Sequence, residues 1–109
     1  MTWQELVVVL ARAVPAGSIT TYAEVSQWGY GKRNLNQPVR SLLHGAANSG
    51  FSALTNRVVG TDGRLAALPG GNMTQQTQLA AEGINFLANG QVNLGKHIPV
   101  TLPAPQSDA

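Results

Sequence analysis

Few side chains in this sequence can carry covalent chemistry, and the strongest nucleophile is missing. The 109 residues contain no cysteine, which excludes disulfides, thiolate metal sites and a thiol nucleophile. His44 and His97 lie far apart without a carboxylate at ligand spacing, so we predict no metal site and no bound cofactor. Thr55 is followed by Asn56 rather than by a base, and such a hydroxyl stays protonated at neutral pH. We therefore expect no reaction at Thr55.

The positive charge is concentrated in one segment. The whole chain has a formal net charge of only +2, yet within residues 32–64 the only acid is Asp62. The basic residues of that segment are Lys32, Arg33, Arg40, Arg57 and Arg64. This distribution suits a polyanion such as nucleic acid. The alternative is a solvated face on a protein with only 11% charged residues.

The length of the chain predicts one small domain with a single core. Neither a leader with a cleavage signature nor an apolar run near the ~20 residues that span a bilayer is present. We expect a cytoplasmic monomer that has no contact with a membrane. Its domain covers residues 1–99, and residues 100–109, rich in proline and small polar residues, form a flexible tail.

Two helices are expected in the first 30 residues. Thr2 and Glu5 have the spacing of a capping box and open a helix that ends before Pro15. The segment Thr21-Tyr22-Ala23-Glu24 repeats this spacing and opens a second helix to about Trp28.

A third helix follows the basic pair at residues 32–33. Asn36 is the expected N-cap, with Pro38 in the first turn. The predicted buried stripe consists of Val39, Leu42, Leu43 and Ala46. The second and third helices have the layout of a helix-turn-helix, with a connection longer than the usual tight turn.

The second half of the chain is predicted to contain short strands, loops and one helix. An irregular loop covers residues 48–51, and residues 58–65 form a small hairpin or wing around the turn at residues 61–63. Residues 68–72 form a flexible loop. Thr74 caps a helix that Gly83 ends, and Asn89-Gly90 is the turn of a second hairpin.

Four short motifs, in this order, resemble a known family. They are Val14-Pro15-Ala16-Gly17-Ser18-Ile19-Thr20-Thr21-Tyr22, Arg57-Val58-Val59 with Asp62-Gly63, Leu79-Ala80-Ala81-Glu82-Gly83, and Gly90-Gln91-Val92-Asn93-Leu94. Together the sequence resembles the DNA-binding domain of the O6-alkylguanine-DNA alkyltransferases, and more closely the alkyltransferase-like proteins, over residues 3–99. The resemblance implies a mixed α/β, mainly helical, winged helix-turn-helix domain.

The resemblance places the expected base pocket at Thr55, Asn56 and Arg57. The repair enzymes have Pro-Cys-His-Arg-Val where this chain has Leu54-Thr55-Asn56-Arg57-Val58, so Thr55 stands at the position of the alkyl-accepting cysteine and Asn56 at that of the activating histidine. Asn56 either reads a base edge through its amide or caps the following strand. Arg57 matches a residue that is structural as much as functional.

The resemblance also assigns the DNA-binding residues. Tyr22 matches a tyrosine that crowds the phosphate of the target nucleotide, preceded by Thr21; the alternative is a half-buried ring at a helix start. An arginine on the recognition helix fills the hole left in the base stack, and its position falls on Gln37 or on Arg40. The basic residues Lys32 and Arg33 precede that helix.

The function implied is non-enzymatic. The resemblance predicts that the protein binds double-stranded DNA with an alkylated guanine from the minor groove, rotates the nucleotide out of the helix, and flags the lesion for nucleotide excision repair proteins. One rival hypothesis is an enzyme that uses Thr55 as nucleophile or general acid. The other is a winged-helix module that binds undamaged DNA or protein without damage recognition.

Overall fold

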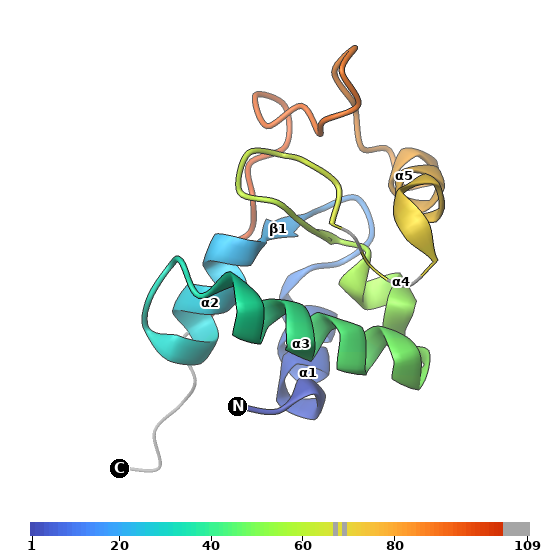
Figure 1. Cartoon of the computed structure of the whole chain (residues 1–109). Helices are drawn as coiled ribbons and strands as arrows, with labels where there is room; N and C mark the ends of the chain where they lie inside the picture. Colours follow the sequence, from blue (N-terminus) through green and yellow to red (C-terminus); the bar gives the residue numbers. More distant parts are fainter. Residues whose placement is uncertain (67, 69, 104–109) are drawn as a thin grey trace.

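Short helices lie below and beside one small sheet in Figure 1, and the chain is a mixed α/β, mainly helical domain as predicted. The computed structural model describes residues 1–66, 68 and 70–103. Its elements, in order, are α1 (Trp3–Ala13), β1 (Thr20–Thr21), α2 (Tyr22–Tyr30), α3 (Asn36–Ala46), the π-helical turn η1 (Ala47–Phe51), α4 (Ser52–Thr55), β2 (Val58–Val59) and α5 (Gly71–Ala81).

The first helix follows its sequence signals closely. Thr2 accepts a hydrogen bond from the backbone N–H of Glu5, and the Glu5 carboxylate accepts one from the backbone N–H of Thr2, so the capping box is complete. The buried face carries Leu6, Val9 and Leu10, which recur at helical spacing. This prediction is confirmed.

The start of α3 differs from the prediction, although its buried stripe does not. Leu35 is the N-cap and Asn36 is already helical, so Asn36 as N-cap is wrong. The backbone N–H of Leu35 donates a hydrogen bond to the hydroxyl of Ser26, outside the helix, at 3.0 Å. The predicted stripe of Val39, Leu42, Leu43 and Ala46 is buried throughout.

The second helix, α2, is longer than predicted. It extends past Trp28 to Tyr30 and ends at a left-handed Gly31.

The chain after α3 continues into η1 where a loop was predicted over residues 48–51, but it leaves helical geometry at Gly50. Gly50, at φ +98°, forms the kink that separates the end of α3 from the start of α4. This kink needs a backbone conformation that glycine adopts without strain. The predicted loop is therefore reduced to a kink at Gly50 and Phe51, and the short helix that follows ends at the buried Thr55.

The two strands pair with each other rather than in the predicted hairpin. Thr20 pairs with Val58 and Thr21 with Val59 in parallel register. The hairpin between Val58-Val59 and Arg64-Leu65 is wrong as a strand pairing: the segment after β2 is a tight loop that a hydrogen bond between Gly60 N–H and the Arg64 carbonyl closes at 2.7 Å. Residues 60–66 are called the β2 loop below.

The last helix starts earlier than predicted. It begins at Gly71 behind a left-handed Gly70, so Thr74 as its cap is wrong and Asn72 lies in the helix rather than in a loop. Pro69, in the predicted loop, lies outside the described residues. Gly83 has φ +90°, as expected after the helix end.

The second hairpin forms in reduced form, and the core continues past it. Phe86 and Val92 make one antiparallel bridge across the Asn89-Gly90 turn. Val100 donates its backbone N–H to the Ile19 carbonyl at 2.7 Å, and Leu102 is buried in the core. The packed part of the chain therefore extends beyond the boundary predicted at residue 99, and the tail prediction for residues 104–109 lies outside the described residues.

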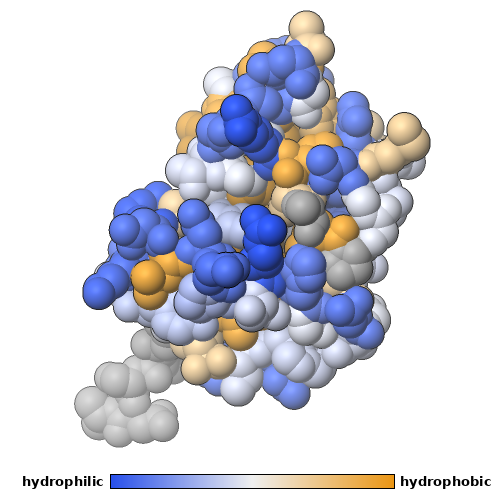
Figure 2. Space-filling view, in the orientation of Figure 1, coloured by the Kyte–Doolittle hydropathy of each residue, from blue (hydrophilic) through white to orange (hydrophobic). Residues whose placement is uncertain are grey.

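The surface is mostly polar on the face shown with the fold. Figure 2 shows hydrophilic and neutral side chains over most of the face along which α3 runs, with apolar ones at scattered positions. In the described part of the chain, no helix combines the length and the apolar character that crossing a membrane requires.

Candidate nucleic-acid interface

The parallel pairing of the strands builds the candidate site. Because β1 and β2 run in the same direction, their ends lie at the same side of the sheet. The end of β1 leads directly into Tyr22, the first residue of α2, and the end of β2 leads into Gly60. Two segments far apart in sequence, the start of α2 and the β2 loop, are therefore neighbours.

An open cleft of about 630 Å³ lies where these segments meet the first turns of α3. Asn36 and Arg40, one helical turn apart, form the α3 wall, since residues at this spacing share a helix face. The residues that line the cleft are Tyr22, Asn36, Arg40, Gly60, Thr61, Asp62, Arg64, Leu65 and Ala66. Its volume lies in the range of ligand-binding clefts.

Tyr22 is both a packed ring and a wall of the cleft. It is only 7% exposed and belongs to the main hydrophobic cluster, so the alternative of a packed ring at a helix start is confirmed in part. Burial raises the pKa of its phenol, and the positive charge of Arg40 partly offsets this rise. The hydroxyl makes no hydrogen bond within the described part of the chain, which leaves it available to a ligand.

The basic segment at residues 32–64 does not form one continuous positive surface. Arg33 pairs with Glu24 at 3.0 Å, and Arg64 pairs with Asp62 at 3.1 Å. Among residues 1–66, 68 and 70–103, Arg40 has no carboxylate within ion-pair distance. The guanidinium of Arg40 is therefore the one in the cleft that is available to bind an anion such as phosphate.

The other predicted DNA-binding residues lie outside the cleft. Thr21 is buried, and its hydroxyl accepts the backbone N–H of Glu24 at 3.3 Å as the N-cap of α2. Lys32 is exposed in the α2–α3 connection, where its carbonyl accepts the Ser26 hydroxyl. Gln37 is exposed on α3 but is not part of the cleft wall. Contacts of these residues with DNA stay predictions.

The expected base pocket is closed in this structure. Thr55 is fully buried, and its hydroxyl donates to the Ser52 carbonyl at 3.3 Å. Asn56 is 4% exposed and donates its amide to Gln78 at 2.9 Å, so it neither caps the strand nor faces the cleft. The contact of Thr55 and Asn56 with a base stays a prediction, and their observed contacts are internal.

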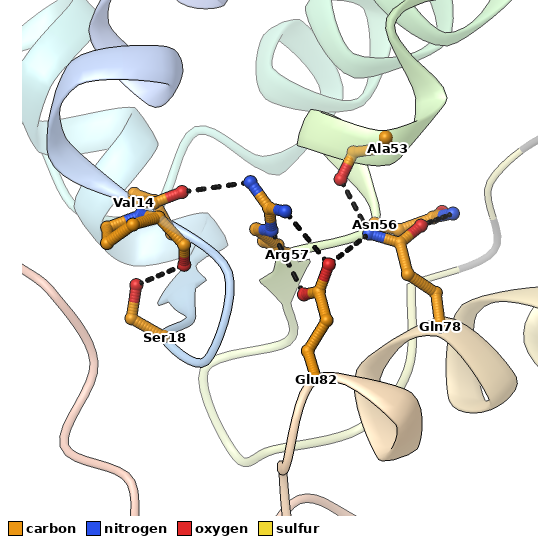
Figure 3. Close-up of polar contacts among 8 residues, drawn as sticks. Val14, Ser18, Ala53, Asn56, Arg57, Gln78 and Glu82 are labelled. Atoms are coloured by element: carbon orange, nitrogen blue, oxygen red, sulfur yellow. Dashed lines mark hydrogen bonds and ion pairs between the residues drawn. The ribbon is translucent and has the colours of Figure 1, made fainter.

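Arg57 has a structural role in a polar network that joins three elements (Figure 3). Its guanidinium binds Glu82 bidentately, at 3.0 Å from Nε to Oε1 and 2.8 Å from Nη2 to Oε2, and donates to the Val14 carbonyl at 3.3 Å. Gln78 connects Asn56 to the same carboxylate. The network fixes the chain before β2 to the end of α5 and the end of α1.

The ion pair shifts the pKa of both partners. The hydrogen bond from Arg57 lowers the pKa of Glu82, more than burial raises it. The hydrogen bond to Glu82 in turn raises the pKa of Arg57. Both groups are therefore charged at neutral pH, in a setting where each side chain is only about 15% exposed.

The β2 loop, which the sequence did not predict as part of the site, forms one wall of the cleft. Asp62, Arg64 and Leu65 line it, together with Asn36, which was expected only as a cap. The sequence does contain a local sign of this wall, because the charged residues Asp62 and Arg64 lie on either side of Gly63 in the predicted turn. Their relation to Tyr22 depends on a strand pairing that no local pattern shows.

The described residues contain no group of three or more histidine, cysteine or acidic side chains placed to hold a metal ion. The polar side chains that line the cleft are a phenol, two guanidinium groups, one carboxylate, one amide and the hydroxyl of Thr61.

The fold has a close counterpart among solved structures. The chain is similar to Atl1 of S. pombe, whose crystal structure was solved in complex with damaged DNA containing O6-carboxymethylguanine. The TM-score is 0.63 at 19% sequence identity, over 89% of this chain and 96% of Atl1. No protein-family model matches the sequence, and no curated protein matches it. The chain has the fold of an alkyltransferase-like protein, as its sequence motifs predicted.

Proposed function

We propose that this protein binds double-stranded DNA containing an alkylated guanine and performs no reaction on it. The observation that carries the proposal is the cleft beside Tyr22, on a fold similar to that of Atl1. The cleft combines the aromatic ring and hydroxyl of Tyr22 with the guanidinium of Arg40, which pairs with no carboxylate of the described residues, and these groups suit a base and its phosphate.

The arginine provides the affinity and the tyrosine region provides the site for the base. Arg40 lies in the first half of α3, which is the second helix of the helix-turn-helix. A guanidinium there neutralises a backbone phosphate and releases a counterion. The α2–α3 pair enters the minor groove, and the alkylated nucleotide rotates out of the helix towards Tyr22.

The absence of a reaction follows from the residues at the position of the family's nucleophile. The chain has no cysteine, and the Thr55 hydroxyl is buried and hydrogen-bonded to a backbone carbonyl. Its neighbour Asn56 carries an amide, which cannot accept the proton of a hydroxyl nucleophile. The protein therefore acts as a sensor, and its complex with DNA, formed by a monomer, marks the lesion for nucleotide excision repair proteins.

A second candidate function is a DNA-binding module without damage recognition. The observation that favours it is the burial of Thr55 and Asn56, which keeps both residues out of the cleft. In that case the cleft binds backbone phosphate through Arg40 and no base enters it. The two candidates differ in whether an alkyl group changes the affinity.

Fluorescence anisotropy with labelled duplexes separates these candidates. One duplex carries O6-methylguanine and the other guanine at the same position, at one fixed salt concentration. The proposal predicts tighter binding of the modified duplex, and loss of that preference in Tyr22→Phe, which removes only the hydroxyl. Arg40→Gln should weaken binding of both duplexes and reduce the salt dependence by about one phosphate contact.

The matched control is Arg12→Gln, which removes the same charge from an exposed position in the last turn of α1, away from the cleft. It should leave the preference unchanged. Equal affinity of the wild type for both duplexes contradicts damage recognition and supports the second candidate. A mass increase of the intact protein by one methyl group after incubation would show that a reaction occurs.

A further inference from the structure

The carboxylate of Asp62 occupies an unusual place for a site that binds a polyanion. It is the one acidic side chain among the described residues that line the cleft. Its Oδ2 lies 3.1 Å from Nε of Arg64, and its Oδ1 accepts the backbone N–H of Arg64 at 3.0 Å. Asp62 thus holds one of the two cleft arginines.

This ion pair contributes little to stability. The side chains of Arg64 and Asp62 are 77% and 56% exposed, and exposed pairs of this kind stabilise a fold only slightly. The β2 loop is instead held by its backbone, with Gly63 bound to the Gly60 carbonyl at 2.9 Å and to the Val92 N–H at 2.8 Å. The main effect of the Asp62–Arg64 pair is therefore electrostatic: it changes how strongly the cleft attracts a charged ligand.

A phosphate and a base meet this carboxylate differently. A phosphate that approaches the exposed guanidinium of Arg64 meets the Asp62 carboxylate beside Nε, and this negative charge repels it. A guanine base offers the N–H groups of its 2-amino substituent, which remain when O6 is alkylated and which a carboxylate accepts. The same side chain that opposes phosphate can therefore bind the base.

We propose that Asp62 is a specificity-determining residue that weakens binding of unmodified duplex by neutralising Arg64, and weakens binding of the alkylated base less. This inference rests on the proposed function of the cleft. It makes Asp62 a repulsive element against the many unmodified sites that compete for the protein.

The test is the exchange Asp62→Asn, which removes the charge and keeps an Oδ1 atom to accept the Arg64 N–H. We expect the affinity for the unmodified duplex to rise about fivefold at low salt, as one close charge interaction in a high dielectric predicts. The salt dependence of this affinity should become steeper by the amount that one additional phosphate contact gives. The affinity for the O6-methylguanine duplex should change less than twofold, so that the preference falls.

Two further variants locate the effect. Glu5→Gln removes the same charge in the capping box of α1, outside the cleft, and should change neither affinity more than twofold. In the Arg64→Gln background, Asp62→Asn should raise the affinity for the unmodified duplex less than twofold, because the arginine it releases is gone.

The inference is wrong if Asp62→Asn leaves the unmodified affinity and the preference unchanged, or if its gain is the same without Arg64. The proposed function fails in a different way, through equal binding of both duplexes by the wild type with Asp62 intact. In that case the effect of Asp62→Asn on the affinity for the unmodified duplex can still be compared between the wild-type and the Arg64→Gln backgrounds. This comparison decides whether Asp62 neutralises Arg64.

Discussion

Removing the charge of Glu82 should destabilise the protein more than any exposed charge change. Glu82 accepts two hydrogen bonds from Arg57 at 3.0 and 2.8 Å, and a third from Gln78 at 3.3 Å. Glu82→Gln keeps the size of the side chain but leaves the partly buried guanidinium without its counter-charge.

The magnitude follows from the burial of this pair. Exposed ion pairs contribute about 0–1 kcal/mol, and breaking a fully buried pair costs about 3–5 kcal/mol. With side chains 14% and 16% exposed, the pair lies between these limits, and we expect a loss of about 2 kcal/mol in the free energy of unfolding. For a domain of this size, that lowers Tm by about 8 °C.

The pH dependence gives the prediction a second readout. The pKa of Glu82 is lowered in the folded state by the Arg57 hydrogen bond, from the ordinary value of 4.5. The stabilisation by ionised Glu82 is therefore complete above the pKa that this carboxyl has in the unfolded chain. It is lost as the pH falls through the lower pKa that Glu82 has in the folded protein. The difference between wild type and Glu82→Gln should be largest at neutral pH and should shrink below about pH 4.5.

Urea unfolding followed by circular dichroism measures both quantities. The matched control is Glu24→Gln, which breaks the pair of Glu24 with Arg33. The Glu24 side chain is 13% exposed, but water screens its 54% exposed partner, so this change should cost less than about 1 kcal/mol. If Glu82→Gln is no more destabilised than this control, or if its deficit persists unchanged at low pH, the structural role assigned to the Arg57 network is wrong.

Two other stability changes follow from the packing. Leu43→Ala removes a fully buried side chain of the main cluster and should cost about 3 kcal/mol in urea unfolding, whereas Val8→Ala, at a position 51% exposed, should cost less than about 0.5 kcal/mol; similar losses would contradict the core assignment. Gly63→Ala should lower Tm more than Gly83→Ala, since both residues have φ +90° but only at Gly63 would the new Cβ meet backbone, 2.8 Å from the Val92 carbonyl oxygen. Equal losses at the two glycines would show that the β2 loop is not held against residue 92.

The elements predicted well are those whose signals are local. The capping box at Thr2 and the buried stripe of α3 each lie within one helix, where spacing alone decides which side chains share a face. The kink at Gly50 and the early start of α5 at Gly71 were missed because glycine also suits loops. In both places a glycine with positive φ lies where one segment ends and a helix begins.

The site was predicted only in part because it depends on distant pairings. Tyr22 and Arg40 were identified and line the cleft, but the β2 loop reaches them through a parallel pair only two residues long, too short to leave a pattern. The partner of Arg57 is a carboxylate from the end of α5, which a charge count along the sequence treats as remote. The sequence therefore overestimates the number of unpaired cations in residues 32–64, because Arg33, Arg57 and Arg64 each pair with a carboxylate.

The most direct test of the central claim is an NMR titration of ¹⁵N-labelled protein with the O6-methylguanine duplex and with its guanine counterpart. We predict that the modified duplex produces additional shift changes at backbone amides of the cleft, in residues 60–66 and at Tyr22 and Arg40. The unmodified duplex should shift mainly residues of α3. Identical shift patterns for the two duplexes, or changes confined to regions outside the cleft, would contradict the claim that the cleft receives the alkylated base.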